Sequence, residues 1–335
     1  MKVLVTGGSG FIGSHVAVDL LEQGSEVVVL DNLENSSYET IARIESLTTS
    51  NVNFVKGDVR DTDFVRSVLS EQEIDAVIHL AARKSVAESV RLPLSYYETN
   101  VAGTLSLLRA MSDQGIYRLV FSSSATVYGI PEFTPIPETH PVGRAASPYG
   151  RSKFFIEETL KDLAGADGRW SIAILRYFNP AGAHSSGAIG ESPQGIPNNL
   201  LPILSRVALG RLPKVAVYGG DYPTVDGTGV RDYLHVCDLA RGHVQALEFI
   251  SEKNGVHAWN MGTGRGYSVL EVLKAFQDVC GKAIPYEISN RRPGDVAECY
   301  ADVSKAEREL GWRSDKGIER MVEDAWRWQS LNPDA

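Results

Sequence analysis

The chain is 335 residues long, carries a formal net charge of −9, and contains 43% hydrophobic and 22% charged residues. These values are ordinary for a globular protein with one large α/β domain, or with a large domain and a smaller partner. Lysine and arginine are scattered along the chain, which disfavours nucleic-acid binding.

Cysteine and histidine usage argues against disulfides and metal sites. Cys237, Cys280 and Cys299 are too few and too far apart for a disulfide framework or a CxxC metal site, and the seven histidines lack metal-ligand spacing. No apolar run approaches the ~18 residues that span a membrane, and the first residues do not resemble a signal peptide. We therefore expect a cytoplasmic protein without a metal.

The first half of the chain alternates predicted strands and helices. Strands are expected at 2–6, 27–30, 52–55, 76–80, 119–121 and 172–175, and the first helix at 11–23. These apolar runs are continuous, which is typical of strands covered on both faces. Helical patterns of ten or more residues separate most of them. The pattern predicts an α/β fold with a Rossmann-like, doubly wound parallel sheet.

The composition changes after Asn179. The next 50 or so residues are rich in Gly, Pro, Ser and Asn, and such a loop-built region suits a substrate pocket. Helices are expected near 199–209 and at 236–250, 268–280 and 316–328. We predict two domains, 1–178 and a smaller α/β domain over 179–335, with part of 232–262 packing back on the first.

A glycine-rich turn lies between the first predicted strand and helix. In Gly7-Gly8-Ser9-Gly10-Phe11-Ile12-Gly13, glycines permit a tight turn and close approach to a pyrophosphate, while the helix N-terminus offers free N–H groups. Asp31 ends the second strand, 18 residues past Gly13. Its carboxylate can bond ribose hydroxyls and would repel a 2′-phosphate. The first domain is therefore expected to bind NAD in preference to NADP.

The stretch from Tyr149 to Lys153 places a phenol and an ammonium one helical turn apart. Tyrosine ordinarily titrates near ~10, and a neighbouring lysine cation lowers that pKa. A YxxxK pair is common by chance, but here Ser124 ends an apolar run about 25 residues upstream and the glycine turn opens the chain. The combination predicts a hydride-transfer site. Tyr149 is its expected base, with a pKa lowered toward neutrality by Lys153 and the positive nicotinamide ring.

Four further stretches narrow the assignment: SSSATVYG at 122–129, RYFNP at 176–180, PQGIPNNL at 193–200 and GTGVRDY at 227–233. With the glycine turn and Ser124, Tyr149 and Lys153, they resemble the UDP-glucose 4-epimerase family of the extended short-chain dehydrogenase/reductase superfamily. The resemblance runs from residue 1 to about 330. It implies reversible C4 epimerisation of UDP-galactose and UDP-glucose, through a 4-keto sugar, with tightly bound NAD.

The resemblance also implies which residues contact the cofactor. They are Gly7, Gly10, Phe11, Ile12, Gly13, Asp31, Asn32, Asp58, Val59, Leu80, Lys84, Thr99, Ser124, Tyr149, Lys153 and Phe178. Asp58 and Val59 would lie at the adenine edge. The family often carries Asn at position 99, where this chain has Thr99 followed by Asn100. The sequence leaves open which of these two makes the contact.

The implied substrate contacts are Lys84, Ser124, Tyr149, Asn179, Asn199, Leu200, Ala216, Tyr218, Arg231, Arg292, Asp295 and Cys299. Arg231 and Arg292 would hold the diphosphate, because a guanidinium fork matches phosphate oxygens. Asn179 and Asn199 would bond the diphosphate and sugar region, and Asp295 the ribose or sugar hydroxyls. Ala216 and Tyr218 would flank the uracil.

Cys299 departs from the family pattern, in which a bulky tyrosine closes the sugar pocket near the 2-position. A small side chain there is associated with enzymes that also accept 2-acetamido sugars. We therefore expect dual specificity, for UDP-galactose/UDP-glucose and UDP-N-acetylgalactosamine/UDP-N-acetylglucosamine. The alternative is that Cys299 is a small buried hydrophobe and another side chain fills the space.

Other functions stay open at this point. A 4,6-dehydratase is disfavoured, because Ala125 and Thr126 stand where an additional acid/base would be needed. An epimerase of another UDP-sugar, a pentose or a uronate, is harder to separate. A non-catalytic NAD-sensing protein would need neither the phenol nor the lysine. The resemblance further implies a homodimer that pairs helices near 90–112 and 149–163.

Overall fold

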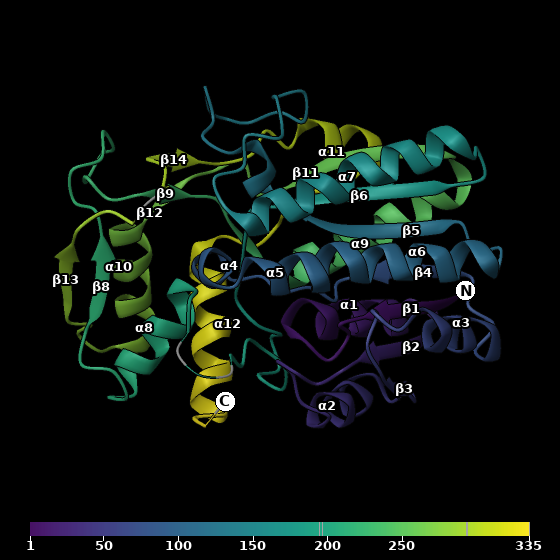
Figure 1. Cartoon of the computed structure of the whole chain (residues 1–335). Coiled ribbons are helices and arrows are strands. Elements are labelled where there is room, and N and C mark those ends of the chain that lie inside the picture. The colour runs from purple at the N-terminus through teal and green to yellow at the C-terminus, as the bar shows by residue number, and fades with distance from the viewer. Residues whose placement is uncertain (194, 196, 293, 335) are drawn as a thin grey trace.

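The computed structural model describes residues 1–193, 195, 197–292 and 294–334 (Figure 1). Its centre is a seven-stranded parallel sheet in the order β11-β6-β5-β4-β1-β2-β3. The strands are β1 (Lys2–Thr6), β2 (Glu26–Asp31), β3 (Asn53–Lys56), β4 (Ala76–His79), β5 (Arg118–Ser124), β6 (Ser171–Tyr177) and β11 (Gly255–Met261). The order reverses between β1 and β4, which is where a doubly wound sheet opens a crevice for a ligand.

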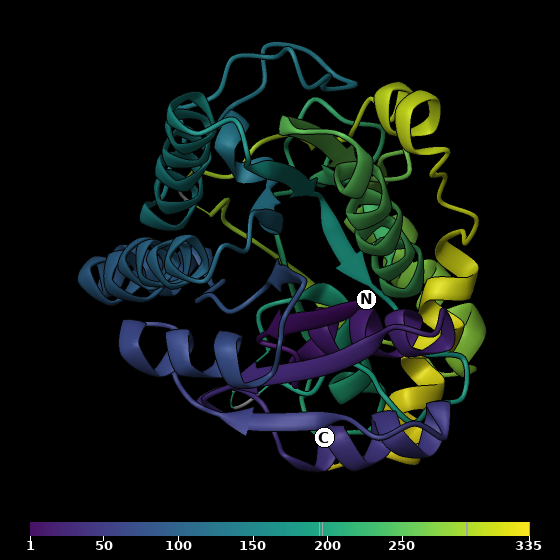
Figure 2. The same cartoon turned by 90° about the vertical axis from the view of Figure 1, so that its right-hand side faces the viewer.

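Helices cover both faces of this sheet because successive side chains of each strand point to opposite sides. Val3 and Val5 of β1 pack with one set of helices and Leu4 with the other, and all three are fully buried. The first set is α1 (Phe11–Glu22), α2 (Glu39–Thr48) and α9 (Val236–Glu252). The second is α3 (Thr62–Glu71), α6 (Gly103–Asp113) and α7 (Pro148–Ala166). Figure 2 shows the two sets on opposite sides of the strands.

The predicted fold class and the six predicted strands of this sheet are confirmed. The seventh strand, β11, was not predicted, because His257 and Asn260 interrupt its apolar residues. It lies at the sheet edge and pairs with β6 from Gly255 to Met261. Its first four residues are only partly buried, which explains the mixed sequence.

A smaller unit lies beyond the carboxyl ends of the main strands, on the left in Figure 1. Its strands form three small sheets: β8 (Val215–Tyr218) with β13 (Tyr286–Ser289), β9 (Val230–Arg231) with β12 (Tyr267–Ser268) and β14 (Glu298–Cys299), and β7 (Asn179–Ala181) with β10 (Tyr233–His235). Its helices are α8 (Leu200–Ala208), α10 (Val269–Cys280) and α12 (Ile318–Leu331), close to their predicted positions. Leu204, Phe276 and Met321 from these helices share one core.

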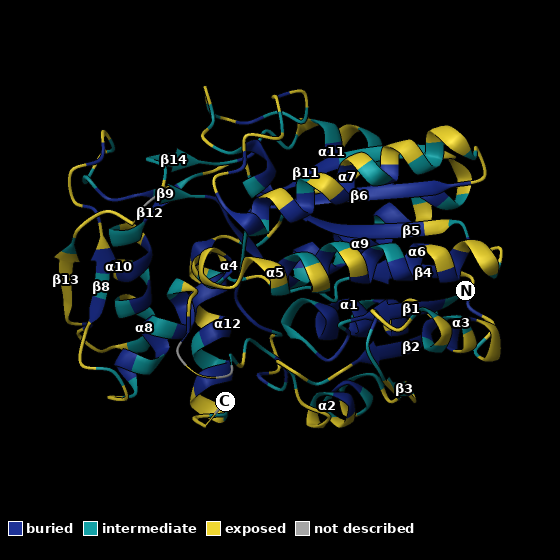
Figure 3. Cartoon of the chain, in the orientation of Figure 1, coloured by how far each residue is buried: buried dark blue, intermediate teal, exposed yellow. Residues whose placement is uncertain are grey.

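Shorter helices complete the chain. They are α4 (Val86–Arg91), α5 (Pro93–Tyr96), the π-helix η1 (Tyr97–Ala102), the 3-10 turn η2 (Ala125–Tyr128) and α11 (Ser304–Leu310). Figure 3 shows that burial concentrates in the main strands and on the inner faces of the long helices. In the described part of the chain, no helix has the length and apolar character needed to cross a bilayer.

Candidate active site

The glycine turn is shaped by close backbone contacts. A Cβ on Gly13 would lie 2.2 Å from the Gly7 carbonyl oxygen, and one on Gly7 would lie 2.8 Å from the Ala81 nitrogen. Gly7 also has φ +71°, a left-handed conformation that favours glycine. Gly10 caps α1 without a side-chain hydrogen bond, so the first N–H groups of the helix remain available to an anion.

Ser9 supplies an independent sign that this turn holds a ligand. Its hydroxyl oxygen is buried and has no hydrogen-bond partner within the described residues. Buried polar groups are ordinarily paired, so an unpaired hydroxyl inside a glycine turn fits a site that a phosphate-bearing cofactor would complete. The Ser9 backbone N–H, in contrast, donates to Asp31 Oδ2 at 3.1 Å.

Asp31 is held rigidly at the end of β2. Besides the Ser9 N–H, its carboxylate accepts the Leu33 N–H at 2.9 Å and the Ser36 hydroxyl at 2.8 Å. Asn32, the next residue, donates to Asp58 Oδ2 at 3.0 Å. The structure thus brings the predicted ribose and adenine contacts together along one edge.

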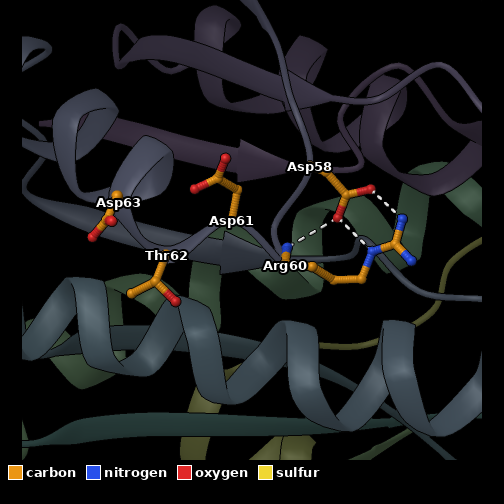
Figure 4. Close-up of a pocket in the computed structure, with 5 residues that line it drawn as sticks. All are labelled: Asp58, Arg60, Asp61, Thr62 and Asp63. Carbon is orange, nitrogen blue, oxygen red and sulfur yellow. Dashed lines mark hydrogen bonds and ion pairs between the residues drawn. The ribbon is translucent and has the colours of Figure 1, made fainter.

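Asp58 has a partner that the sequence analysis missed. The Arg60 guanidinium lies along its carboxylate, with Nε 2.9 Å from Oδ1 and Nη2 2.7 Å from Oδ2 (Figure 4). Hydrogen bonds from Arg60 hold the pKa of Asp58 well below its usual range. These residues line a shallow surface hollow with Asp61, Thr62 and Asp63. The spacing of Asp58 and Arg60, two residues apart in the sequence, could have indicated this contact. Val59 beside them is buried in the core.

The catalytic candidates meet where β5 ends and α7 begins. Ser147 caps α7 by accepting the Gly150 N–H at 3.1 Å, and Pro148 occupies its first turn, so Tyr149 is fixed at the helix start. The Tyr149 phenol lies beside the Ser124 hydroxyl, which favours the ionised form of the phenol and so lowers its pKa. Ser124 Oγ also accepts the Thr126 N–H at 3.2 Å. Two of the three predicted catalytic residues are therefore in contact.

Lys153 is engaged differently from the prediction. Its buried ammonium donates to the Ser122 carbonyl at 2.6 Å and lies 4.9 Å from the centre of the Phe121 ring. Burial lowers the pKa of Lys153 to about 7, and Glu157 partly opposes this. Burial raises the pKa of Tyr149, and the neighbouring Ser124 hydroxyl only partly offsets this. In the chain by itself, burial dominates the Tyr149 pKa and the Lys153 ammonium bonds the Ser122 carbonyl. A pKa lowered by Lys153 together with the nicotinamide ring stays a prediction for the site with its cofactor.

The Asn100 side chain forms hydrogen bonds within the protein. Its Oδ1 accepts the Arg83 N–H at 2.8 Å, and its Nδ2 donates to the Arg83 carbonyl at 3.0 Å and to Ser152 Oγ at 3.1 Å. The residue is only 1% exposed. Since the donors and the acceptor of the Asn100 side chain already bond Arg83 and Ser152, Thr99 is the better candidate for the cofactor contact. Both residues lie in the π-helix η1, a type of helix often found at functional sites.

Four of the predicted substrate residues of the smaller unit form two pairs. Arg231 on β9 makes an ion pair with Asp295, and its Nη1 donates to the Val230 carbonyl at 2.7 Å. Arg292 stacks on the Tyr218 ring, with its guanidinium carbon 3.9 Å from the ring centre. Ala216 precedes Tyr218 by two residues on β8 and Leu200 begins α8.

Glu191 connects the two units and was also missed. Its Oε1 accepts both the Lys84 ammonium at 3.0 Å and the Asn199 amide at 2.6 Å. Lys84 follows β4 of the main sheet, whereas Asn199 caps α8 of the smaller unit. The Glu191 side chain is only 11% exposed. No local pattern marks this residue, because its partners lie 107 and 8 residues away.

Cys299 lies near the catalytic candidates. It packs against a cluster that includes Ala125 and Phe178, which directly follow β5 and β6. Burial raises the pKa of its thiol to about 11, so the thiol is neutral near pH 7. The predicted substrate contact Asn179 follows Phe178 and begins β7. The predicted cofactor contact Leu80 follows β4, and its backbone N–H donates to the Thr6 carbonyl at the end of β1.

The chain is similar to known proteins in sequence and in structure over nearly its whole length. A model of the family described as GDP-mannose 4,6 dehydratase matches residues 4–325. The UDP-glucose 4-epimerase of Bacillus subtilis is 56% identical over 332 residues, which are 99% of this chain and 98% of that protein. The chain belongs to the UDP-glucose 4-epimerase family.

Solved structures of this family superpose closely. The UDP-glucose 4-epimerase of Bifidobacterium longum, in complex with NAD+ and UDP, gives a TM-score of 0.97 at 51% identity and covers 100% of this chain and 99% of its own. The Stenotrophomonas maltophila UDP-glucose-4-epimerase, with bound NAD and formylated UDP-arabinopyranose, also gives 0.97, at 49% identity and 99% coverage of both chains. The family resemblance drawn from the sequence is confirmed, and with it the expectation of an NAD-dependent isomerase.

We predict that Gly13→Ala impairs cofactor retention. The added methyl would collide with the Gly7 carbonyl and displace the turn from the start of α1. NAD released from the denatured protein should fall at least tenfold relative to wild type. Gly165→Ala is the matched control, since a Cβ there meets open space on α7 and should leave NAD content unchanged. Full NAD content in Gly13→Ala would contradict this role of the turn.

Proposed function

We propose that this chain interconverts UDP-galactose and UDP-glucose by reversible oxidation at C4. The observation that carries the proposal is the Tyr149–Ser124 contact at the end of β5, in a chain of the UDP-glucose 4-epimerase family. C4–H of a sugar is not acidic, so simple deprotonation cannot invert this centre. Oxidation of the alcohol to a ketone removes the stereocentre, and reduction from the other face inverts it.

In the proposed mechanism, the Tyr149 phenolate takes the proton of the 4-hydroxyl and returns it to the same oxygen after the sugar has turned over. The Ser124 hydroxyl holds the 4-oxygen during both transfers. NAD, when bound, supplies the hydride acceptor and donor, and the positive charge that the buried phenol needs to ionise. Lys153 completes the site and would hold the nicotinamide ribose.

We propose that residues 1–178, with the part of 232–262 that includes β11, hold NAD, and that 179–335 hold the UDP-sugar. The glycine turn would bind the pyrophosphate, Asp31 the adenosine ribose and Thr99 a nearby group. The unpaired Ser9 hydroxyl supports an anion in the turn. A cofactor that is unchanged overall must stay bound between the two half-reactions.

The substrate has to find cations in an acidic protein. We propose that Arg231 and Arg292 bind the diphosphate, and that Lys84 and Asn199 turn from Glu191 toward the substrate when it enters. Tyr218 would offer a flat surface to the uracil. These cations are presently balanced by Asp295 and Glu191, or stacked on Tyr218.

We also propose activity on UDP-N-acetylgalactosamine and UDP-N-acetylglucosamine. Cys299 packs beside Ala125 and Phe178, next to the residues that would flank the sugar. A cysteine occupies much less volume than the family's tyrosine, so the pocket wall recedes near the sugar 2-position. The neutral thiol adds no charge that would oppose an acetamido group.

We propose a homodimer built on the face that joins α4, α5 and α7. Its exposed apolar side chains are Val86, Val90, Leu92, Leu94 and Phe155. Tyr97 and Phe155 lie 6.2 Å apart between ring centres, so the α4–α5 side and α7 form one continuous surface. An exposed apolar surface of this kind is typical of an interface, and the same patch on two copies gives a closed dimer.

The first test follows the anomeric proton of UDP-galactose by NMR with no added NAD. Wild-type protein should convert it, and Tyr149→Phe should lower kcat at least a thousandfold while retaining bound NAD, because only the proton acceptor is lost. Tyr286→Phe, on the exposed edge of β13, is the control and should be fully active. Turnover by Tyr149→Phe near the wild-type rate would refute the assigned base.

The second test concerns the pocket wall. Wild type should also convert UDP-N-acetylgalactosamine, whereas Cys299→Tyr should lose this activity at least a hundredfold and keep UDP-galactose turnover within about threefold, a discrimination of the size that steric pocket contacts supply. Cys299→Ala, which stays small, should keep both activities. An equal loss on both sugars in Cys299→Tyr, or no loss, would show that position 299 does not select the substrate.

The third test concerns assembly. Light scattering on a sizing column should give twice the 36.5 kDa chain mass for wild type. Leu94→Glu should shift the protein toward monomer, because a charge would be buried in an apolar interface. Ile288→Glu, equally a surface hydrophobe but on β13, should remain a dimer. A monomeric wild type, or an unaffected Leu94→Glu, would argue against this face.

A further inference from the structure

Each residue of the run Ser122–Ser124 at the end of β5 contacts a different side chain of α7. The partners, in order, are Lys153, Glu157 and Tyr149. The three helix residues are spaced by four, so they share one face of α7. Two of them belong to the proposed chemistry, whereas Glu157 and its serine partner do not.

Glu157 docks the helix on the strand through a short hydrogen bond. The Ser123 hydroxyl donates to Glu157 Oε1 at 2.6 Å, one residue before Ser124. Glu157 itself lies one turn beyond Lys153 and two turns beyond Tyr149. Any shift of this contact would therefore move the Tyr149 phenol relative to Ser124.

A buried arginine holds Glu157 in place. Arg176 on β6 donates from Nε to Oε1 at 3.0 Å and from Nη2 to Oε2 at 2.7 Å, and the two side chains are 4% and 0% exposed. Arg176 Nη1 in turn donates to Tyr128 Oη at 2.9 Å. A buried ion pair is often no more stabilising than apolar packing, so its presence here calls for another reason.

The negative charge of Glu157 offers a reason for the buried ion pair. Lys153 is enclosed by strands and helices, and a carboxylate one helical turn away favours its charged form. The ionisable groups beside Lys153 or Tyr149 are Tyr96 on α5, His79 on β4, Tyr177 on β6 and Glu157 on α7. Their own partners are Glu88 on α4, His243 on α9 and Arg176 on β6. Of the four groups beside Lys153 or Tyr149, only Glu157 forms an ion pair among the residues that the structure describes, and its partner is Arg176.

We propose that Glu157, clamped by Arg176, is a positioning residue that sets both the place and the charge environment of Tyr149 and Lys153 against Ser124. This inference rests on the proposed epimerase function. Glu157 is not expected to touch the Tyr149 phenol oxygen or the sugar 4-oxygen, between which the proton moves. It acts through the Ser123 hydrogen bond, which fixes α7 on β5, and through a negative charge that Arg176 balances.

The test measures kcat and KM for UDP-galactose across pH, on protein with its NAD bound. Glu157→Gln leaves the Arg176 cation unbalanced, and a more positive site favours the phenolate. The acid limb of kcat should therefore move down by about half to one pH unit, while maximal kcat falls about tenfold and KM stays within twofold. The double variant Glu157→Gln/Arg176→Gln removes both charges, so its acid limb should return to the wild-type position.

Two single variants separate placement from charge. Ser123→Ala removes the hydrogen bond and keeps both charges, so kcat should fall severalfold with an unmoved acid limb. Glu158→Gln changes the neighbouring exposed carboxylate, which pairs with Lys161, and should match wild type in every respect. If Glu157→Gln does not fold, the double variant and Ser123→Ala still decide, because neither leaves an unpaired buried charge.

The outcomes are distinct. An acid limb common to wild type, Glu157→Gln and the double variant would overturn the charge role, as would a displaced limb in the double variant. Wild-type kcat in Ser123→Ala would overturn the placement role. Absence of UDP-galactose turnover in wild type with bound NAD would instead reject the proposed function on which the inference rests.

Discussion

Parallel pairing of the main strands is the constraint on which the rest of this structure depends. A parallel sheet gathers the carboxyl ends of all its strands at one edge, and here β1, β2, β4, β5 and β6 deliver the glycine turn, Asp31, the loop to Lys84, Ser124 and Phe178 to that edge. These residues are far apart in the chain. Only the shared strand direction brings them to one edge of the sheet, and the smaller unit lies beyond that edge (Figure 1).

The net charge of the chain is −9, so a site for an anionic UDP-sugar would need local cations. The structure keeps the three cations of the proposed substrate site close to a compensating group. Arg231 is paired with Asp295, Lys84 with Glu191, and Arg292 rests on the Tyr218 ring. Exchange of one anionic partner for another changes little net charge. In the proposed mode of binding, a diphosphate would enter without a long-range rearrangement and would break only local contacts that are partly exposed.

Local spacing made part of this structure predictable from the sequence. The glycine turn and the Tyr149–Lys153 spacing act over one turn, and continuous apolar runs marked six of the seven main strands. Pairings between distant segments left no such signal. Glu191 joins two units, and β11 is a partly exposed edge strand with a mixed sequence. Burial raises the pKa of Tyr149 in the chain by itself, and spacing alone does not reveal that burial.

That pKa has a consequence for the order of events. Burial favours the neutral phenol of Tyr149, and the Lys153 ammonium donates its hydrogen bond to the Ser122 carbonyl. Without a further positive charge, the proposed base remains protonated near neutral pH and could not take the proton of an alcohol. The oxidised nicotinamide is the cation that a site of this kind would hold beside the phenol. Deprotonation of the sugar would then be coupled to the presence of a hydride acceptor, so that an alkoxide does not form where it cannot be oxidised.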